Sequence, residues 1–252
     1  MSTALKMGAA GRAKGGAKGG AKGGGRRWLK WLVLGPLLAV VLVQLYFFVM
    51  ICWWTQFNPS TTSMMRLQLA ALREKNPDAK LEQAWVPYAR ISNNLKRAVI
   101  ASEDANFAEH DGVDWEALEK AYERNNKRHK VVGGGSTITQ QLAKNLFLSG
   151  SRNYLRKGQE LVIAYMLEAV MSKQRILEIY LNVVEFGRGV FGAEAAARHY
   201  YRSAAASLNA SQAARLAVML PNPRYYDAHR QTNYLARRSA IIQRRMNAAD
   251  LP

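Results

Sequence analysis

The chain has 252 residues, of which 49% are hydrophobic, and 36 Lys and Arg against 18 Asp and Glu give a formal charge of +18. This hydrophobic content is enough for a packed core and excludes a wholly disordered chain. The single cysteine, Cys52, excludes a disulfide scaffold, a four-cysteine zinc site and an iron–sulfur cluster.

Residues 1–30 form a basic, glycine-rich tail. Eight Lys and Arg and no acid lie there, and the tetrad AKGG is repeated three times over 13–24. Such a segment has almost nothing apolar to bury, so we expect 1–30 to be disordered. A nucleic-acid-binding tail would also be basic. The segment that follows favours a membrane protein instead, and we expect no nucleic-acid partner.

Residues 31–54, WLVLGPLLAVVLVQLYFFVMICWW, carry no charge. A helix of this length reaches about 36 Å and crosses the ~30 Å hydrocarbon layer of a bilayer. A buried core helix is one alternative. A cleaved signal peptide is another, but its apolar part is usually shorter and followed by an A-x-A site. We therefore predict a transmembrane helix, and the cations before it place the tail in the cytoplasm and 55–252 outside.

The exported domain, 55–252, is predicted to be mostly α-helical, because alternating strand patterns are nearly absent. Thr137 and Gln140 have the spacing of a helix-starting capping box. The charged run 113–132 is expected to be a mobile segment between two helices. The predicted helices cover 93–110, 137–148, 153–171, 173–184, 192–202, 210–220 and 233–248.

Two adjacent acids, Glu103 and Asp104, interrupt the apolar pattern of the first of these helices. Neighbours on a helix point about 100° apart, so at most one of them shares the apolar face of Val99. A carboxyl beside apolar surface has a raised pKa, which suits a general acid or base. A solvated helix edge is the alternative. His110, further along, is expected to form a hydrogen bond at the helix end.

Three glycines and Ser136 precede the helix that carries Gln140, Gln141 and Lys144. Glycines expose backbone N–H groups, and a helix N-terminus adds partial positive charge, so this segment is suited to holding phosphate. The residue order is not that of a nucleotide P-loop. A glycine hairpin followed by an ordinary helix cap is the alternative.

A further charged cluster consists of Arg152, Arg156, Lys157 and Glu160. Positions 152, 156 and 160 are four residues apart, which places them on one face of a helix. They are either an anion site with a second acid or, for Arg156 and Glu160, a surface ion pair. The histidines lack metal-ligand spacing, so we expect no structural metal. The S-x-x-K acyl-enzyme motif is absent.

Five segments, taken together and in order, resemble the motifs of the peptidoglycan glycosyltransferases, glycosyltransferase family 51. They are SEDANFAEHDG, GGSTITQQLAKN, RKGQE, KQRILEIYLN and GVFGAEAAARHYY. Tyr201 stands where the family usually has Phe. The resemblance covers roughly 85–225 and, with no S-x-x-K motif and no further domain, indicates the monofunctional biosynthetic type. It implies a mostly α, lysozyme-like catalytic domain with a smaller membrane-proximal lobe behind one N-terminal transmembrane helix.

The resemblance also implies a reaction. Lipid II would be polymerised into glycan strands by inverting transfer, with β-1,4 bonds formed and undecaprenyl pyrophosphate released. Glu103 would be the general base, and Glu160 a second carboxylate that orients the donor or a metal, or assists departure of the leaving group. Lys144 and Arg152 would hold the pyrophosphate. The donor site would be lined by Ser136, Gln140, Gln141, Lys144, Arg152 and Arg156.

No dedicated cofactor is expected, although a divalent cation, Mg²⁺ or Mn²⁺, could assist at the pyrophosphate. Glu178, Asn182 and His110 are expected to be structural within their motifs. The expected partners are lipid II, the growing glycan, the membrane and other cell-wall synthesis or division proteins, at the bacterial inner membrane. A lysozyme-like lytic enzyme that cleaves the same bond and an inactive membrane-anchored scaffold are the alternatives. The cations Lys144 and Arg152 argue against the first, and the intact Glu103 and Glu160 against the second.

Overall fold

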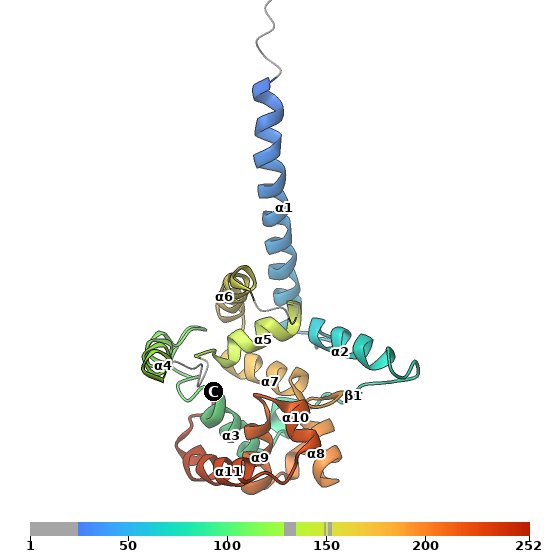
Figure 1. The fold of residues 1–252 in the computed structure, drawn as a ribbon, viewed down its shortest axis with the longest axis vertical. Helices are drawn as coiled ribbons and strands as arrows, with labels where there is room; N and C mark the ends of the chain where they lie inside the picture. The colour runs from blue at the N-terminus through green and yellow to red at the C-terminus, as the bar shows by residue number, and fades with distance from the viewer. Residues whose placement is uncertain (1–24, 129–134, 149, 151–152) are drawn as a thin grey trace, which may run out of the picture. The chain divides into compact units, whose positions relative to one another are not determined.

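A computed structural model describes residues 25–128, 135–148, 150 and 153–252. The chain forms two compact units, 1–44 and 45–252. Figure 1 colours the ribbon from blue at the N-terminus to red at the C-terminus and labels the helices and strands. Residues 1–24, most of the predicted tail, lie outside the described part of the chain.

Helix α1 runs from Gly25 to Trp54 and contains the predicted membrane span. Its segment Trp31–Trp54 has a mean hydropathy of 2.5, and its most apolar stretch buries nothing. Side chains such as Leu38 and Val41 are more than half exposed, which is costly in water and favourable in a bilayer. The helix is therefore long and apolar enough to cross a membrane, as a membrane anchor must. Residues 25–30, expected in the disordered tail, continue the helix instead.

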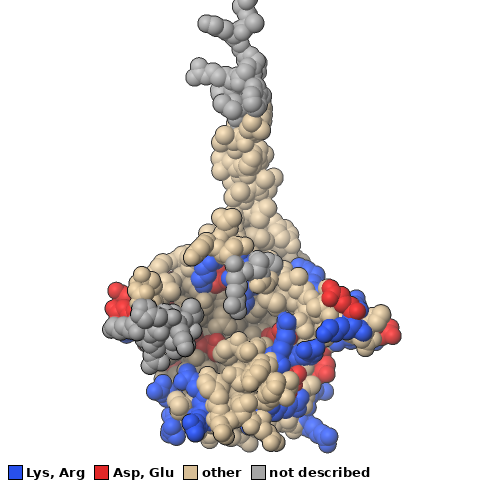
Figure 2. All heavy atoms as spheres, in the orientation of Figure 1, with Lys and Arg blue, Asp and Glu red and all other residues tan. Residues whose placement is uncertain are grey.

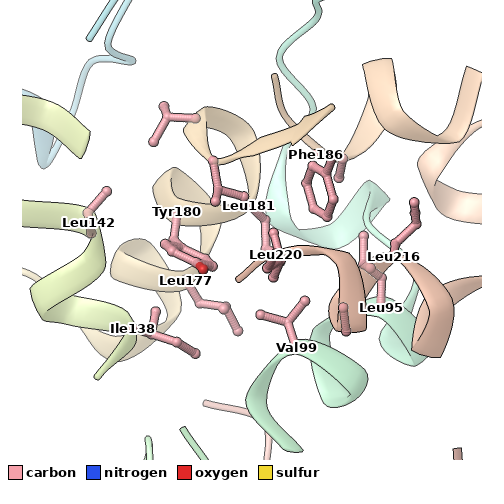
Figure 3. Packing of buried hydrophobic residues seen from close by; sticks show 14 of the residues in the cluster. Leu95, Val99, Ile138, Leu142, Leu177, Tyr180, Leu181, Phe186, Leu216 and Leu220 are labelled. Atoms are coloured by element: carbon pink, nitrogen blue, oxygen red, sulfur yellow. The ribbon is translucent and has the colours of Figure 1, made fainter. Parts of the chain in front are cut away.

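The 45–252 unit is built around two groups of helices, and helix α5 (Ile138–Phe147) is central to the first. It packs against α2 (Ser63–Arg73), α6 (Tyr154–Val170) and α7 (Lys173–Val183). In the second group, α9 (Ala210–Met219) packs against α3 (Asn93–Glu103) and α11 (Asn233–Arg245). Figure 3 shows side chains of both groups meeting in one hydrophobic core, with Leu95 and Val99 of α3 and Leu142 of α5 among them.

The predicted scarcity of strands is confirmed within the described residues. Strands β1 (Glu82–Gln83), β2 (Glu185–Gly187) and β3 (Val190–Phe191) form one small sheet in the order β1-β3-β2. β1 pairs with β3 in parallel and β2 pairs with β3 antiparallel. Gly192 follows with φ +84°, and a Cβ there would lie 2.6 Å from the Asn182 carbonyl oxygen, so this turn requires glycine.

Each predicted helix is present, and the largest difference in length is in the first. Helix α3 ends at Glu103 instead of continuing to 110, because Asp104 takes an extended φ of −162°. Its carboxylate is then free to bind other parts of the chain. The remaining helical segments are α8 (Ala193–Tyr201), α10 (Pro223–Ala228) and the short 3-10 helices η1 (Tyr88–Arg90), η2 (Ala205–Ser207) and η3 (Met246–Ala248). Helices α2 and α10 were not predicted.

The expectation of a mobile segment over 113–132 is wrong for its central part, which forms helix α4 (Trp115–Arg128). The carboxylate of Asp114 accepts from the backbone N–H of Ala117 at 2.7 Å and so caps the helix. Lys120 and Glu116 form an ion pair one turn apart. Local side-chain interactions therefore support a helix that buries little. Residues 129–132 lie outside the described residues.

Candidate active site

Glu103 is the last residue of α3 and is half-buried. Its Oε2 accepts a hydrogen bond from Nε2 of Gln141 at 2.9 Å. Burial raises the pKa of Glu103 above its ordinary value, and the negative charge of Asp104 acts in the same direction. The Gln141 hydrogen bond and the positive charge of Arg238, on α11, oppose this rise in pKa. The group can therefore take up a proton more readily than an exposed glutamate.

Asp104, the adjacent acid, has a structural role. It is buried, and its Oδ1 lies 2.8 Å from Nε2 of His110 while its Oδ2 accepts from the backbone N–H of Ile138 at 2.9 Å. Because Ile138 is the first residue of α5, the Asp104 carboxylate fixes that helix to the end of α3. The expected role of His110 as a hydrogen bonder is confirmed, although it lies in a loop.

The predicted start of α5 is confirmed in part. Thr137 is the N-cap and accepts from the backbone N–H of Gln140 at 3.2 Å. The Gln140 side chain has another partner, since its Oε1 accepts from Nζ of Lys157 at 3.0 Å. Gln140 is only 2% exposed, so it holds the Lys157 ammonium group from the buried side.

Lys157 joins the cap of α5 to the acid of α6 and was absent from the predicted site. Its Nζ donates to Oγ of Ser136 at 3.0 Å and lies 2.6 Å from Oε1 of Glu160. Arg156 occupies the other oxygen of Glu160 at 2.7 Å. The Glu160 side chain is 5% exposed, so the alternative of a surface ion pair is wrong. Nε of Arg156 is buried with no acceptor among the described residues.

Lys144 is half-buried on α5. Burial lowers the pKa of Lys144, and the charge of Glu160 opposes this effect. Within the described part of the chain, no carboxylate lies at ion-pair distance from its ammonium group, so its charge is available to a ligand. Arg152, the other predicted pyrophosphate residue, lies outside the described residues.

Glu103 lines one hollow, and its hydrogen-bond partner Gln141 lines another. One, of about 140 Å³, is lined by Glu103 and Ser136 together with residues of the 104–106 loop and α4. The other, of about 270 Å³, is lined by Gln141, Lys144 and Arg224 together with residues of the turn before α10. Figure 2 shows a hollowed face of this unit with Lys and Arg atoms around it and acidic atoms within. This arrangement offers one space at the Glu103 carboxylate and a second at the amide that binds it.

Sequence reasoning noted Lys157 beside Arg156 and Glu160 but did not place it in the site, although it precedes Glu160 by three residues and so shares its helix face. Two residues that act on Glu103 or on its partner Gln141 were missed. Tyr180 of α7, whose hydroxyl donates to Oε1 of Gln141 at 2.9 Å, and Arg238 of α11 are distant in sequence and carry no local signal.

The expected structural roles of Glu178 and Asn182 are confirmed. Glu178 pairs with Arg175 at 3.0 Å. The Asn182 amide is fully buried and bonds the backbone N–H and carbonyl of Val86. Asn182 thereby holds the segment before α3 against α7.

Comparison with known proteins assigns the family. Residues 70–247 match the family model described as transglycosylase. The biosynthetic peptidoglycan transglycosylase of Janthinobacterium sp. (strain Marseille) is 69% identical, over 90% of this chain and 98% of that protein. The proteins of the same name from Methylobacillus flagellatus and Bordetella pertussis are 61% and 60% identical, over 86% and 87% of this chain and 96% and 93% of theirs. The mostly helical, lysozyme-like architecture expected from the motifs is thus confirmed, and the chain belongs to the transglycosylase family, the glycosyltransferases of peptidoglycan synthesis.

Proposed function

We propose that the chain polymerises lipid II into glycan strands with Glu103 as the general base. The observation that carries this assignment is the place of the Glu103 carboxylate, which lines one hollow and accepts a hydrogen bond from Gln141, a residue that lines a second hollow. Two sugar substrates would approach each other there. The relatives named biosynthetic peptidoglycan transglycosylases support the substrate class. A single base between two sites is what condensation of two sugars requires.

In this mechanism the 4-hydroxyl of the acceptor sugar gives its proton to Glu103. The acceptor oxygen then attacks C1 of the terminal MurNAc of the growing glycan, inverts that carbon and forms a β-1,4 bond, while undecaprenyl pyrophosphate leaves. The raised pKa of Glu103, caused by its burial, makes the carboxylate a stronger base than an exposed glutamate. Its hydrogen bond from Gln141 holds one oxygen and keeps the carboxylate oriented.

The cations beside Glu103 suit the departure of a pyrophosphate. Lys144, Arg156 and Lys157 surround a single acid, Glu160, so the cluster carries excess positive charge. Charge that builds on the leaving group in the transition state would be stabilised there. By resemblance, Arg152 would contribute a further guanidinium group. Ser136 would line the same space through its contact with Lys157.

The residues around Glu160 do not fit a dedicated divalent-cation site. Both of its carboxylate oxygens already accept from Arg156 and Lys157. Within the described residues, no three His, Cys, Asp or Glu side chains cluster as metal ligands would. In this proposal side-chain cations therefore neutralise the pyrophosphate, and no step depends on a metal.

We place residues 55–252 on the outer face of the bacterial inner membrane and the basic tail in the cytoplasm. The excess of Lys and Arg before the apolar helix supports this orientation. A lipid-linked donor would then be drawn from the same bilayer that anchors the enzyme. Other cell-wall synthesis or division proteins would be its further partners.

The test is incubation of the detergent-solubilised full chain with labelled lipid II. Formation of polymer supports the proposal, cleavage of added glycan would indicate a lytic enzyme, and neither would indicate a scaffold. Glu103→Gln keeps the size of the side chain but removes the base, so polymerisation should fall by about 10²–10⁴-fold. Glu109→Gln, an exposed acid six residues along, is the matched control and should stay active. Normal turnover by a folded Glu103→Gln variant would refute the assignment.

A further inference from the structure

We propose that Tyr180 is a positioning residue for the catalytic base. Its hydroxyl fixes the orientation of the Gln141 side-chain amide, and that amide presents an N–H donor to the Glu103 carboxylate. The proposal rests on the assignment of Glu103 as the general base. It also gives Gln141 a role toward the base, in addition to the donor-binding role implied by the resemblance.

The geometry is a continuous chain of two hydrogen bonds. The hydroxyl of Tyr180 donates to Oε1 of Gln141 at 2.9 Å, and Nε2 of Gln141 donates to Oε2 of Glu103 at 2.9 Å. The three residues come from α7, α5 and α3, so the two hydrogen bonds join both groups of helices. The orientation of each side chain is therefore set by a partner on a different helix.

Tyr180 is held rigidly enough for this role. It is completely buried, and Figure 3 shows its ring within the hydrophobic core, near Leu177 and Leu181 of its own helix. Close packing of this kind leaves the ring a single position. The phenol oxygen is the part of the side chain that reaches the polar site.

The direction of these two hydrogen bonds follows from which side chains can donate a proton. Burial, together with the charges of Glu103 and Asp104, holds the pKa of Tyr180 well above its ordinary value, so the phenol stays protonated and can donate. A glutamine amide has one accepting end and one donating end. With its oxygen turned to Tyr180, its nitrogen must face Glu103, whereas the reversed amide would set an oxygen against the carboxylate.

Other groups also act on Glu103, but they act differently. Asp104 is a neighbouring negative charge, and Lys144 on α5 and Arg238 on α11 are positive charges that interact with it through space. Ser102 approaches the other carboxylate oxygen at 3.4 Å. Gln141 makes the short hydrogen bond, so control of its amide controls how readily Glu103 ionises.

Tyr180→Phe removes the hydroxyl and keeps the ring. The Gln141 amide is then free to reverse, the ionised form of Glu103 loses its donor for part of the time, and its pKa rises. A general base must be deprotonated to act, so the acid limb of the pH profile of kcat should move upward by about one pH unit. The KM for lipid II should change less than twofold. Tyr200→Phe is the matched control. The half-buried Tyr200 hydroxyl donates to the Phe186 carbonyl at 3.0 Å and does not contact Glu103 or Gln141, so the pH profile of this variant should be unchanged.

Gln141→Leu tests the second bond of the chain and also serves if the Tyr180 variant fails to fold, which circular dichroism will show. It should shift the acid limb in the same direction, and adding Tyr180→Phe to it should cause no further shift. An unshifted limb in either variant, or shifts that add in the double variant, overturns the proposal. Activity in folded Glu103→Gln would instead overturn the proposed function, so the two failures are distinguishable.

Discussion

The adjacent acids Glu103 and Asp104 should respond in opposite ways to loss of their charge. The Asp104 carboxylate accepts from the Ile138 backbone and contacts His110 while its side chain is 2% exposed. Hydrogen bonds to a charged group contribute about 1.5–3 kcal/mol each. Asn at 104 keeps an oxygen for one partner and loses the charge, so the free energy of unfolding should fall by about 2–3 kcal/mol. For a unit of this size, that lowers Tm by about 4–12 °C.

Glu103→Gln should do the reverse. The folded-state pKa of Glu103 is raised by burial, so the folded protein holds its proton more tightly than the unfolded chain does. Stability is then lost as pH rises through and above the unfolded value of about 4.3. Gln removes this penalty. The variant should match the wild type near pH 4, unfold at a higher temperature than the wild type at pH 7, and lack polymerase activity.

Both effects can be measured on the same detergent-solubilised samples. Thermal unfolding followed by circular dichroism at pH 4 and pH 7 gives the change in Tm, and labelled lipid II gives the activity. Asp104→Asn should retain measurable polymerisation where it remains folded. If Asp104→Asn unfolds within about 1 °C of the wild type and Glu103→Gln loses several degrees at pH 7, the roles assigned to the two acids are reversed.

The remaining predictions concern the cations and the tail. Lys144→Ala should lower kcat/KM for lipid II by about 10²–10³-fold with little change in Tm; full activity of the folded variant would contradict the pyrophosphate assignment. Lys157→Met leaves the buried Glu160 with Arg156 as its only paired cation among the described residues, so it should reduce both Tm and polymerisation. An unchanged Tm would argue against a contribution of Lys157 to stability. Deletion of residues 1–24 should leave turnover in detergent nearly unchanged, because the tail is predicted on the other side of the membrane, and a large loss at normal yield would contradict that topology.

Local sequence signals predicted the helices well where burial or a cap supports them. The cap at Thr137 and the apolar faces of α3, α6, α7 and α9 were all legible from spacing. Helix α4 was missed because few of its positions are apolar, and its support comes from Asp114 and from a pair one turn apart. The length of α3 was overestimated because hydrophobic spacing does not show that Asp104 leaves the helix to bind the start of α5.

In the candidate site, too, local features could be predicted from the sequence and contacts between helices could not. The two adjacent acids at 103 and 104 indicated a possible acid or base, and the family resemblance singled out Glu103, whereas the contact between Arg156 and Glu160 was expected from their spacing. Which residue holds Glu103 could not be read from its surroundings in the sequence, because Gln141 is 38 positions away and Tyr180 lies on a third helix. Contacts between helices depend on packing, and periodicity within one helix does not encode them.

The start of α5 explains how one short segment both builds the fold and serves the chemistry. Its buried side contacts the rest of the domain through Thr137, which donates to the Gly112 carbonyl at 2.6 Å, and Thr139, which donates to Glu168 at 2.6 Å. Its other side brings Gln141 and Lys144 to one hollow, and Gln141 also bonds Glu103. These contacts lie within two turns of one helix. A shift of the helix end would therefore displace both Gln141, which donates to Glu103, and Lys144, the cation proposed for the leaving group. The spacing of polar residues in this segment is therefore constrained by stability and by catalysis at once, which is why its sequence carries a signal for both.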